Sequence, residues 1–139
     1  MKRIIFVSIT ILLTNLVVAQ NISEQLFNLP NVIFNKVLTP VGYEGAYELK
    51  IKQPLDHNDK SKGYFYQRVF LSHAGFDEPN VMVTNGYANS KNRISEPAAL
   101  LGANQINIEH RFFGESMPDS LDYNYLNLKQ VAGDLHHIN

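Results

Sequence analysis

Residues 81–116 decide the fold of this chain, and they read VMVTNGYANSKNRISEPAALLGANQINIEHRFFGES. Residues 81–84 and 105–109 are two runs of strand-forming side chains, and each is followed by a polar loop. Between them, residues 95–102 begin with a capping serine, carry a proline in the first turn and end at a glycine, as a short helix does. This order predicts a βαβ unit of a parallel sheet, and thus an α/β fold. Ligands bind where the strands of such sheets end, so we expect the functional residues in the two loops.

The first 19 residues have the features of a signal peptide. Lys2 and Arg3 precede an apolar stretch, residues 4–18, that several polar residues interrupt, and Ala19 lies at a small-residue cleavage site. A membrane anchor needs roughly 20 unbroken apolar residues. We therefore predict export to the periplasm or the extracellular space, without a stable membrane anchor.

Composition narrows the possible functions further. The formal net charge is −1, and no basic run is longer than two residues, which argues against a nucleic-acid partner. The chain has no cysteine, so an exported domain of this sequence must rely on apolar packing, without disulfides, a thiolate nucleophile or cysteine metal ligands.

The early part of the mature chain divides at about residue 44. Residues 20–44 show neither a sustained helical period nor clean alternation, and two prolines interrupt them, so we expect an irregular arm before a domain at 45–139. Residues 47–52 alternate apolar and polar side chains, which predicts a half-buried strand. Residues 64–72 resume strand composition, and the two strands are expected to pair antiparallel at one edge of the sheet.

A helix is predicted at the end of the sequence. Asn127 can cap it, and Gln130 can reach back to complete a capping box. Four apolar residues form a stripe that should pack on the sheet: Leu128, Val131, Leu135 and Ile138.

No metal or cofactor site is predicted. Asp56, His57 and Asp59 share a turn-rich loop, but Lys60 stands where a calcium loop needs an acceptor, so we interpret the segment as a solvated loop. His136 and His137 are neighbours on the predicted helix and point about 100° apart, so they cannot bind one ion together.

The loop after residue 84 offers backbone chemistry. Gly86 gives the chain conformational freedom and lets a ligand approach the main chain closely. In α/β serine hydrolases the loop after the third strand supplies an N–H to the oxyanion hole. Gly86 and Tyr87 are the candidates for this role, and a glycine required only by the turn is the alternative.

The loop after residue 108 carries charged residues. Glu109 and Arg111 lie two apart and are expected to share a face, either as a structural ion pair or as an anchor for a charged substrate terminus. His110 is interpreted as a structural hydrogen-bonding residue, because the triad histidine of serine hydrolases follows the nucleophile in chain order. Residues 114–118 begin like a Gly-x-Ser-x-Gly nucleophile elbow, but Pro118 replaces the second glycine. We therefore reject Ser116 as a nucleophile.

Five blocks carry a resemblance to a known family: QPLDH at 53–57, QRV at 67–69, VTNGY at 83–87, NQ at 104–105 and EHRFFGES at 109–116. In this order they resemble the N-terminal part of the secreted serine aminopeptidases that release tri- and tetrapeptides, often after proline. The first and last blocks are also similar to the lysosomal prolyl carboxypeptidase group. The blocks span roughly residues 43–139.

The resemblance implies the N-terminal part of an α/β-hydrolase sheet, truncated before the nucleophile strand. It implies a Ser-Asp-His triad beyond Asn139, no catalytic residue within this chain, no cofactor, and a peptide as the substrate. What carries over to this sequence is the oxyanion-loop position at Gly86 and Tyr87 and the rim at residues 109–111. Two alternatives stay open: a non-catalytic exported binding module that retains half of the fold, and an esterase of the same fold.

Overall fold

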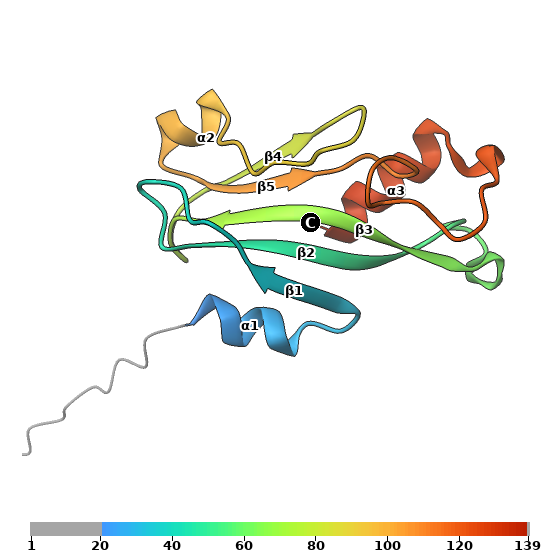
Figure 1. Cartoon of the computed structure of the whole chain (residues 1–139), viewed down its shortest axis with the longest axis horizontal. Coiled ribbons are helices and arrows are strands. Elements are labelled where there is room, and N and C mark those ends of the chain that lie inside the picture. Colours follow the sequence, from blue (N-terminus) through green and yellow to red (C-terminus); the bar gives the residue numbers. More distant parts are fainter. Residues whose placement is uncertain (1–20, 139) are drawn as a thin grey trace, which may run out of the picture.

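Five strands form one mixed sheet in the computed structural model, which describes residues 21–138 (Figure 1). The sheet order is β1-β2-β3-β5-β4. The strands are β1 (Val32–Lys36), β2 (Gly45–Pro54), β3 (Tyr64–His73), β4 (Asn80–Thr84) and β5 (Asn104–Ile108). The predicted signal peptide, residues 1–19, lies outside the described residues. Within residues 21–138, no helix is both long and apolar enough to cross a bilayer.

The first three strands are antiparallel, and β3 also pairs antiparallel with β5. The predicted alternation in β2 is confirmed, because Tyr47 and Leu49 belong to the buried core while Glu48 and Lys50 lie on the opposite face. The expected antiparallel pairing of β2 with β3 is also confirmed. Its position at the sheet edge is not, because β1 lies outside β2 and forms that edge.

The predicted βαβ unit is confirmed. β4 and β5 are parallel neighbours, and helix α2 (Glu96–Leu101) connects them. Ser95 caps α2 by accepting a hydrogen bond from the Ala98 N–H at 3.4 Å, and Gly102 ends it in the left-handed conformation at a φ of 61°. Since Thr84 pairs in register with Ile108, both strands end at the same edge of the sheet.

The structure corrects the expected irregular arm at residues 20–44. Helix α1 (Ile22–Asn28) is capped by the Asn21 side chain, which accepts from the Ser23 N–H at 3.0 Å, and β1 follows it. Leu26 is buried in the core beside Tyr47. A seven-residue helix and a five-residue strand are too short to show a sustained period in the sequence. Pro30 separates the two elements and does not prevent either of them.

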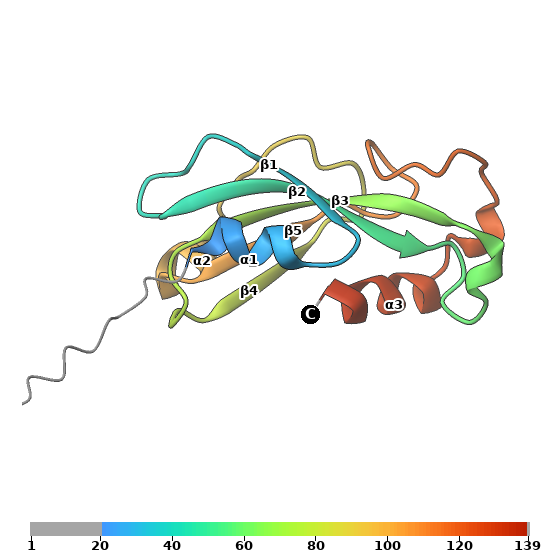
Figure 2. The ribbon, with the colours of Figure 1, turned by 90° about the horizontal axis from the view of Figure 1, so that it is seen from below.

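Helices α1 and α3 (Leu128–Ile138) pack on one face of the sheet (Figure 2). The core there joins α1, β2, β3 and β5, with the end of α3 packed against it. Its buried members are Leu26, Tyr47, Leu49, Val69 and Ile108, and Leu135 and Ile138 contact them. Two short 3-10 helices, Lys60–Lys62 and Tyr123–Tyr125, lie in the loops near the other end of α3.

Helix α3 begins where predicted but presents a different face. Asn127 caps it, since its Oδ1 accepts from the Gln130 N–H at 3.1 Å. The Gln130 side chain does not complete a capping box; its Oε1 accepts from the His57 N–H at 2.8 Å. Leu128, expected in the apolar stripe, is 88% exposed, and the buried residues of the helix are Gln130 and Asp134. The helix therefore meets a polar loop with its first turns and the apolar sheet only with its last.

The contact between α3 and His57 leads to a prediction about Gly133. A Cβ at position 133 would lie 2.6 Å from Cγ of the His57 ring, which Asp134 holds in place. Gly133→Ala should therefore lower the free energy of unfolding by about 1–3 kcal/mol, although alanine is the better helix former by about 1 kcal/mol. Urea unfolding of the full-length protein would measure the change.

Gly86→Ala is the matched control, because its added methyl group would meet no atom within 4 Å and should leave stability unchanged. A gain in stability for Gly133→Ala would contradict the packing of His57 on α3.

Candidate functional site

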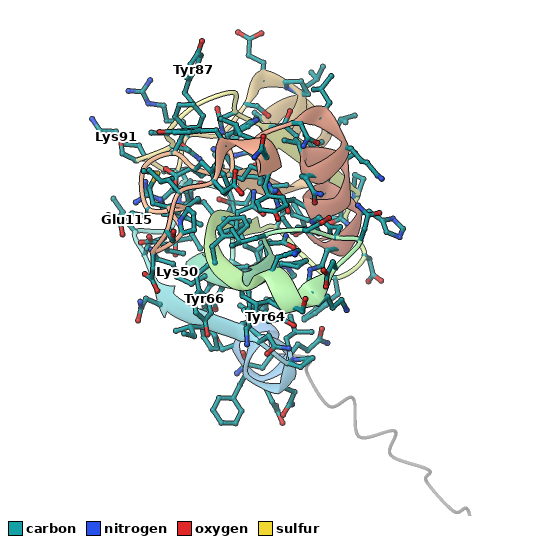
Figure 3. All side chains as sticks on the ribbon, turned by 90° about the vertical axis from the view of Figure 1, so that its right-hand side faces the viewer. Lys50, Tyr64, Tyr66, Tyr87, Lys91 and Glu115 are labelled. Carbon is teal, nitrogen blue, oxygen red and sulfur yellow. The ribbon has the colours of Figure 1, made fainter. Side chains whose placement is uncertain are left out.

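The structure brings the two predicted loops together at the edge where β4 and β5 end. The Asn85 N–H donates to the carbonyl of Ile108 at 3.1 Å, and the His110 N–H donates to the carbonyl of Tyr87 at 3.4 Å. The Tyr87 ring meets the Phe113 ring edge to face, with centroids 5.5 Å apart. Tyr87 is 74% exposed and projects outward in Figure 3. The segment 85–87 is thus attached to the loop after β5 on one side and open on the other.

The backbone conformation of Gly86 is not one that requires glycine. Its φ is not positive, and a Cβ at this position would have open space, so the fold does not require a glycine there. The open space does leave the main chain accessible to a ligand. Within residues 21–138, no hydrogen bond uses the N–H of Gly86 or of Tyr87. Both candidate donors are therefore available.

A groove of about 540 Å³ adjoins this loop. It is lined by Val83 of β4, the chain between β4 and α2, and Asn107 of β5. Asn85 and Asn89 contribute to its wall, so the groove lies beside the loop, but Gly86 and Tyr87 do not line it.

Glu109 is fully buried, and its carboxylate accepts four hydrogen bonds. Its Oε1 accepts from Arg68 Nη2 at 2.7 Å and from the Asn89 N–H at 2.7 Å. Its Oε2 accepts from the Glu115 N–H at 3.0 Å and from Ser116 Oγ at 2.8 Å. The carboxylate therefore joins β3, the loop after β4 and the loop after β5.

Arg111 is also fully buried, and all five of its N–H donors have partners. Nε and Nη2 bind the two carboxylate oxygens of Asp134 at 2.7 and 2.9 Å. The remaining donors bind backbone carbonyls of Pro54, Leu55 and Tyr125 at 2.7–3.1 Å. Such a bidentate, charge-assisted pair is among the stronger polar interactions in proteins.

The expected pairing of Glu109 with Arg111 is wrong. Each has its own opposite charge, Arg68 for Glu109 and Asp134 for Arg111. β5 ends at Ile108, so the two-residue alternation of a strand no longer applies to Glu109 and Arg111. Both groups have structural partners, as the ion-pair interpretation proposed, but with different residues.

His110, interpreted from the sequence as a structural residue, and Ser116, rejected there as a nucleophile, both make contacts within the fold. His110 Nδ1 lies 2.8 Å from the carbonyl of Arg111, and its ring meets the Phe113 ring edge to face. Ser116 is buried; its Oγ donates to Glu109 and accepts from the Arg68 N–H at 2.9 Å.

The sequence suggested that the loop with Asp56 and His57 is solvated, but in the structure it contacts α3. His57 Nε2 lies 2.7 Å from Oδ1 of Asp134, and Gln130 donates to Asp56 at 2.7 Å. The Asn58 backbone N–H, and next the Gln130 side chain, lower the pKa of the Asp56 carboxyl. Stability from a lowered carboxyl pKa is present above its ordinary value and is lost as the pH falls through the folded-state pKa. The contribution of Asp56 to this loop–helix contact is therefore lost only in acid.

Sequence reasoning missed a buried polar chain that connects α3 with Glu109. Gln53 donates to Gln67 Oε1 at 3.0 Å and to the Asp134 carbonyl at 3.2 Å, and Gln67 donates to the Glu109 carbonyl at 2.9 Å. The sequence pattern could have indicated this network, because Gln53 and Gln67 occupy inward-facing positions in the alternation of β2 and β3. A buried amide needs partners, so such positions indicate a network.

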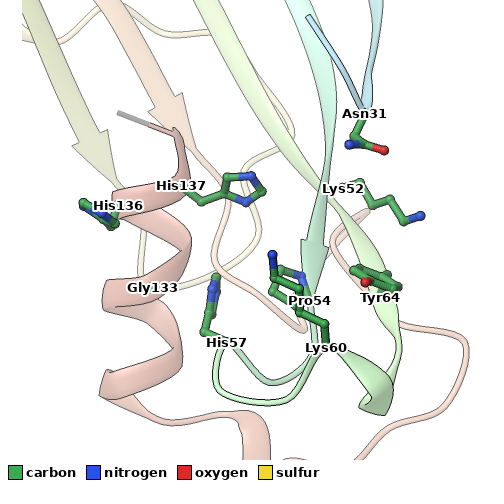
Figure 4. A pocket seen from close by; sticks show the side chains of 9 residues that line it. All are labelled: Asn31, Lys52, Pro54, His57, Lys60, Tyr64, Gly133, His136 and His137. Atoms are coloured by element: carbon green, nitrogen blue, oxygen red, sulfur yellow. The ribbon is translucent and has the colours of Figure 1, made fainter.

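A second groove, of about 640 Å³, lies between the 54–64 loop and α3 (Figure 4). Lys52, Lys60 and three histidines contribute to its lining, and Lys52 Nζ lies 4.4 Å from the centroid of the Tyr64 ring. None of the residues predicted from the sequence as site residues lines it. Across residues 21–138, no cluster of three or more His, Asp or Glu side chains could hold a metal ion.

Comparisons with known proteins agree with the resemblance found in the sequence. Residues 17–139 match the family model described as PS-10 peptidase S37. Over 119 residues the chain is 34% identical to a prolyl tri/tetrapeptidyl aminopeptidase from Streptomyces mobaraensis. The match covers 85% of this chain and 25% of that protein. The chain therefore spans about a quarter of the length of this curated relative.

The geometry of Arg111 yields a prediction for Asp134. Asp134→Asn keeps the shape of the side chain but leaves the guanidinium buried without a balancing charge. The free energy of unfolding should fall by about 3–5 kcal/mol, measured by urea unfolding of the full-length protein.

Glu115→Gln is the control, because Glu115 pairs with Lys50 at 3.1 Å on the exposed surface, where screening by water leaves little stabilisation. Equal losses for the two variants would show that Asp134 does not balance Arg111.

Proposed function

Because these matches show that the chain belongs to the peptidase S37 family, we propose that it is the N-terminal part of a secreted serine exopeptidase. The proposed substrates are peptides from which tri- or tetrapeptides are released, in line with the name of the Streptomyces relative. The chain spans 25% of that relative, so the activity proposed is that of the whole protein. The Ser-Asp-His triad is proposed to follow Asn139.

The observation that carries the proposal is the open main chain at Gly86 and Tyr87. In acyl transfer, backbone N–H groups stabilise the oxyanion that develops in the transition state, and losing one such donor typically costs about 10²–10³ in kcat. In the loop after β4 the N–H groups of Gly86 and Tyr87 have no acceptor within residues 21–138, a groove lies beside the loop, and the loop is attached to the end of β5. These properties suit an oxyanion loop.

The topology supports an α/β-hydrolase sheet as the scaffold. Antiparallel strands lead into a parallel βαβ unit, and the candidate loop follows the first strand of that unit. Ligands of open α/β sheets bind at the carboxyl ends of the strands, which is where this loop lies.

The direct test is activity of the full-length protein. We expect hydrolysis of a tripeptidyl arylamide and loss of that activity after labelling by a serine-directed phosphonate. Hydrolysis of a short-chain aryl ester without hydrolysis of the arylamide would favour the esterase alternative. A folded full-length protein with neither activity would favour the binding module.

Gly86→Ala tests the loop itself. The added methyl group meets no protein atom, so only a bound ligand could contact it. We expect kcat/KM for the arylamide to fall by about tenfold or more, which corresponds to about 1.4 kcal/mol of transition-state stabilisation, while the melting temperature stays the same. Ser120→Ala, an exposed change outside the loop, should leave both unchanged. A Gly86→Ala protein with full activity would remove this loop from the proposed site.

A further inference from the structure

We propose that Glu109 is a positioning residue for catalysis, which holds the loop containing Gly86 and Tyr87 in its working geometry. The inference rests on the function proposed above. It assigns to a fully buried carboxylate the task of keeping two backbone donors in place.

Residues 85–89 are attached to the rest of the sheet edge at both ends. At its start, the Asn85 N–H binds the carbonyl of Ile108, and the carbonyl of Tyr87 accepts from His110. Beyond Tyr87, the Asn89 N–H donates to Glu109 Oε1 at 2.7 Å. The first attachment joins main chain to main chain and is reinforced by the Asn85 side chain, which also donates to the carbonyl of Ile108 at 3.3 Å. The second depends on the Glu109 side chain. The direction of the N–H groups at 86 and 87 is therefore sensitive to Glu109.

The carboxylate is itself held rigidly. Arg68 Nη2 shares Oε1 with the loop, and Ser116 Oγ fixes Oε2 while also accepting from the Arg68 N–H. Gly114 takes a left-handed φ of 54°, and a Cβ there would overlap the Glu109 carboxylate. The chain after β5 thus closes around Glu109, and no water-exposed surface of this residue remains.

The four hydrogen-bond donors around the Glu109 side chain require a carboxylate, with its two acceptor oxygens and its negative charge. A glutamine has one acceptor oxygen, and its NH₂ group would face donors in either orientation. One orientation leaves the Asn89 N–H without its acceptor, and the other leaves the Glu115 N–H without one. Glu109→Gln therefore keeps the volume and removes the coordinated support of the two loops.

The Arg111 network supplies a matched control. Gln130 of α3 is buried like Glu109, and its side chain binds Asp56 and the His57 N–H. Among residues 21–138 it makes no hydrogen bond to the segment 85–89. Gln130→Ala should lower stability without altering the candidate oxyanion loop.

The experiment compares Glu109→Gln and Gln130→Ala with the wild type in the full-length protein. For Glu109→Gln we expect kcat on a tripeptidyl arylamide to fall by about tenfold to a hundredfold, as small misplacements of catalytic groups do, with KM within about threefold. Amide hydrogen exchange across residues 85–92 should become faster. Gln130→Ala should lower the melting temperature and leave both kcat and this exchange unchanged.

A measurement on the wild type covers the case in which Glu109→Gln does not fold. The Asn89 amide should exchange more slowly than the Gly86 and Tyr87 amides, because only Asn89 has an acceptor. Equal exchange at the three positions would overturn the proposal, as would an unchanged kcat in folded Glu109→Gln. An inactive wild type with a protected Asn89 amide would instead overturn the proposed function.

Discussion

The buried guanidinium of Arg111 constrains the rest of this structure. A charged group removed from water is costly unless it is paired and fully hydrogen-bonded, and breaking such a pair costs about 3–5 kcal/mol. Arg111 meets the requirement by drawing together the end of β2, the 3-10 helix at Tyr123–Tyr125 and the carboxylate of Asp134 on α3. The position of α3 follows from this, because its apolar contacts with the sheet are confined to its last turns. Its buried first turns are polar and match the loop around His57.

Two charged networks lie side by side at this end of the sheet, and the chain passes from one to the other within three residues. Glu109 belongs to the network that contains Arg68, Ser116 and the loop after β4. Arg111 belongs to the network of α3. The switch occurs where β5 ends and Phe112 takes a left-handed conformation. The segment 109–116 is therefore a structural junction, and its charges are already used within the fold. Glu109 and Arg111 are thus not available to a ligand, whereas the main chain at Gly86 and Tyr87 and the groove-lining side chains of Lys91 and Arg93 are.

Under this proposal, residues 21–138 contribute the oxyanion loop and its support to a peptidase of the S37 family. This part of the chain supplies a sheet edge, a loop in which the Gly86 and Tyr87 N–H groups have no acceptor among residues 21–138, and a buried carboxylate that supports the loop. Preorganised donors of this kind stabilise charge without reorganising at the moment of reaction. The chain spans 25% of its aminopeptidase relative, so the nucleophile and the pocket that selects the peptide belong, in this proposal, to the rest of the protein.

The sequence by itself determined the elements with strong local patterns. These are the alternating β2, the capped helices after Ser95 and Asn127, the parallel βαβ unit, and the ordered blocks that indicate the family. Such patterns are readable because caps, turns and periods depend on residues only a few positions apart. The tertiary structure alone decided the partners of Glu109, Arg111 and Gln130, and the helix and strand in residues 20–44. A side chain beyond the end of a strand has no period to set its direction, so its partner depends on which distant segment packs beside it.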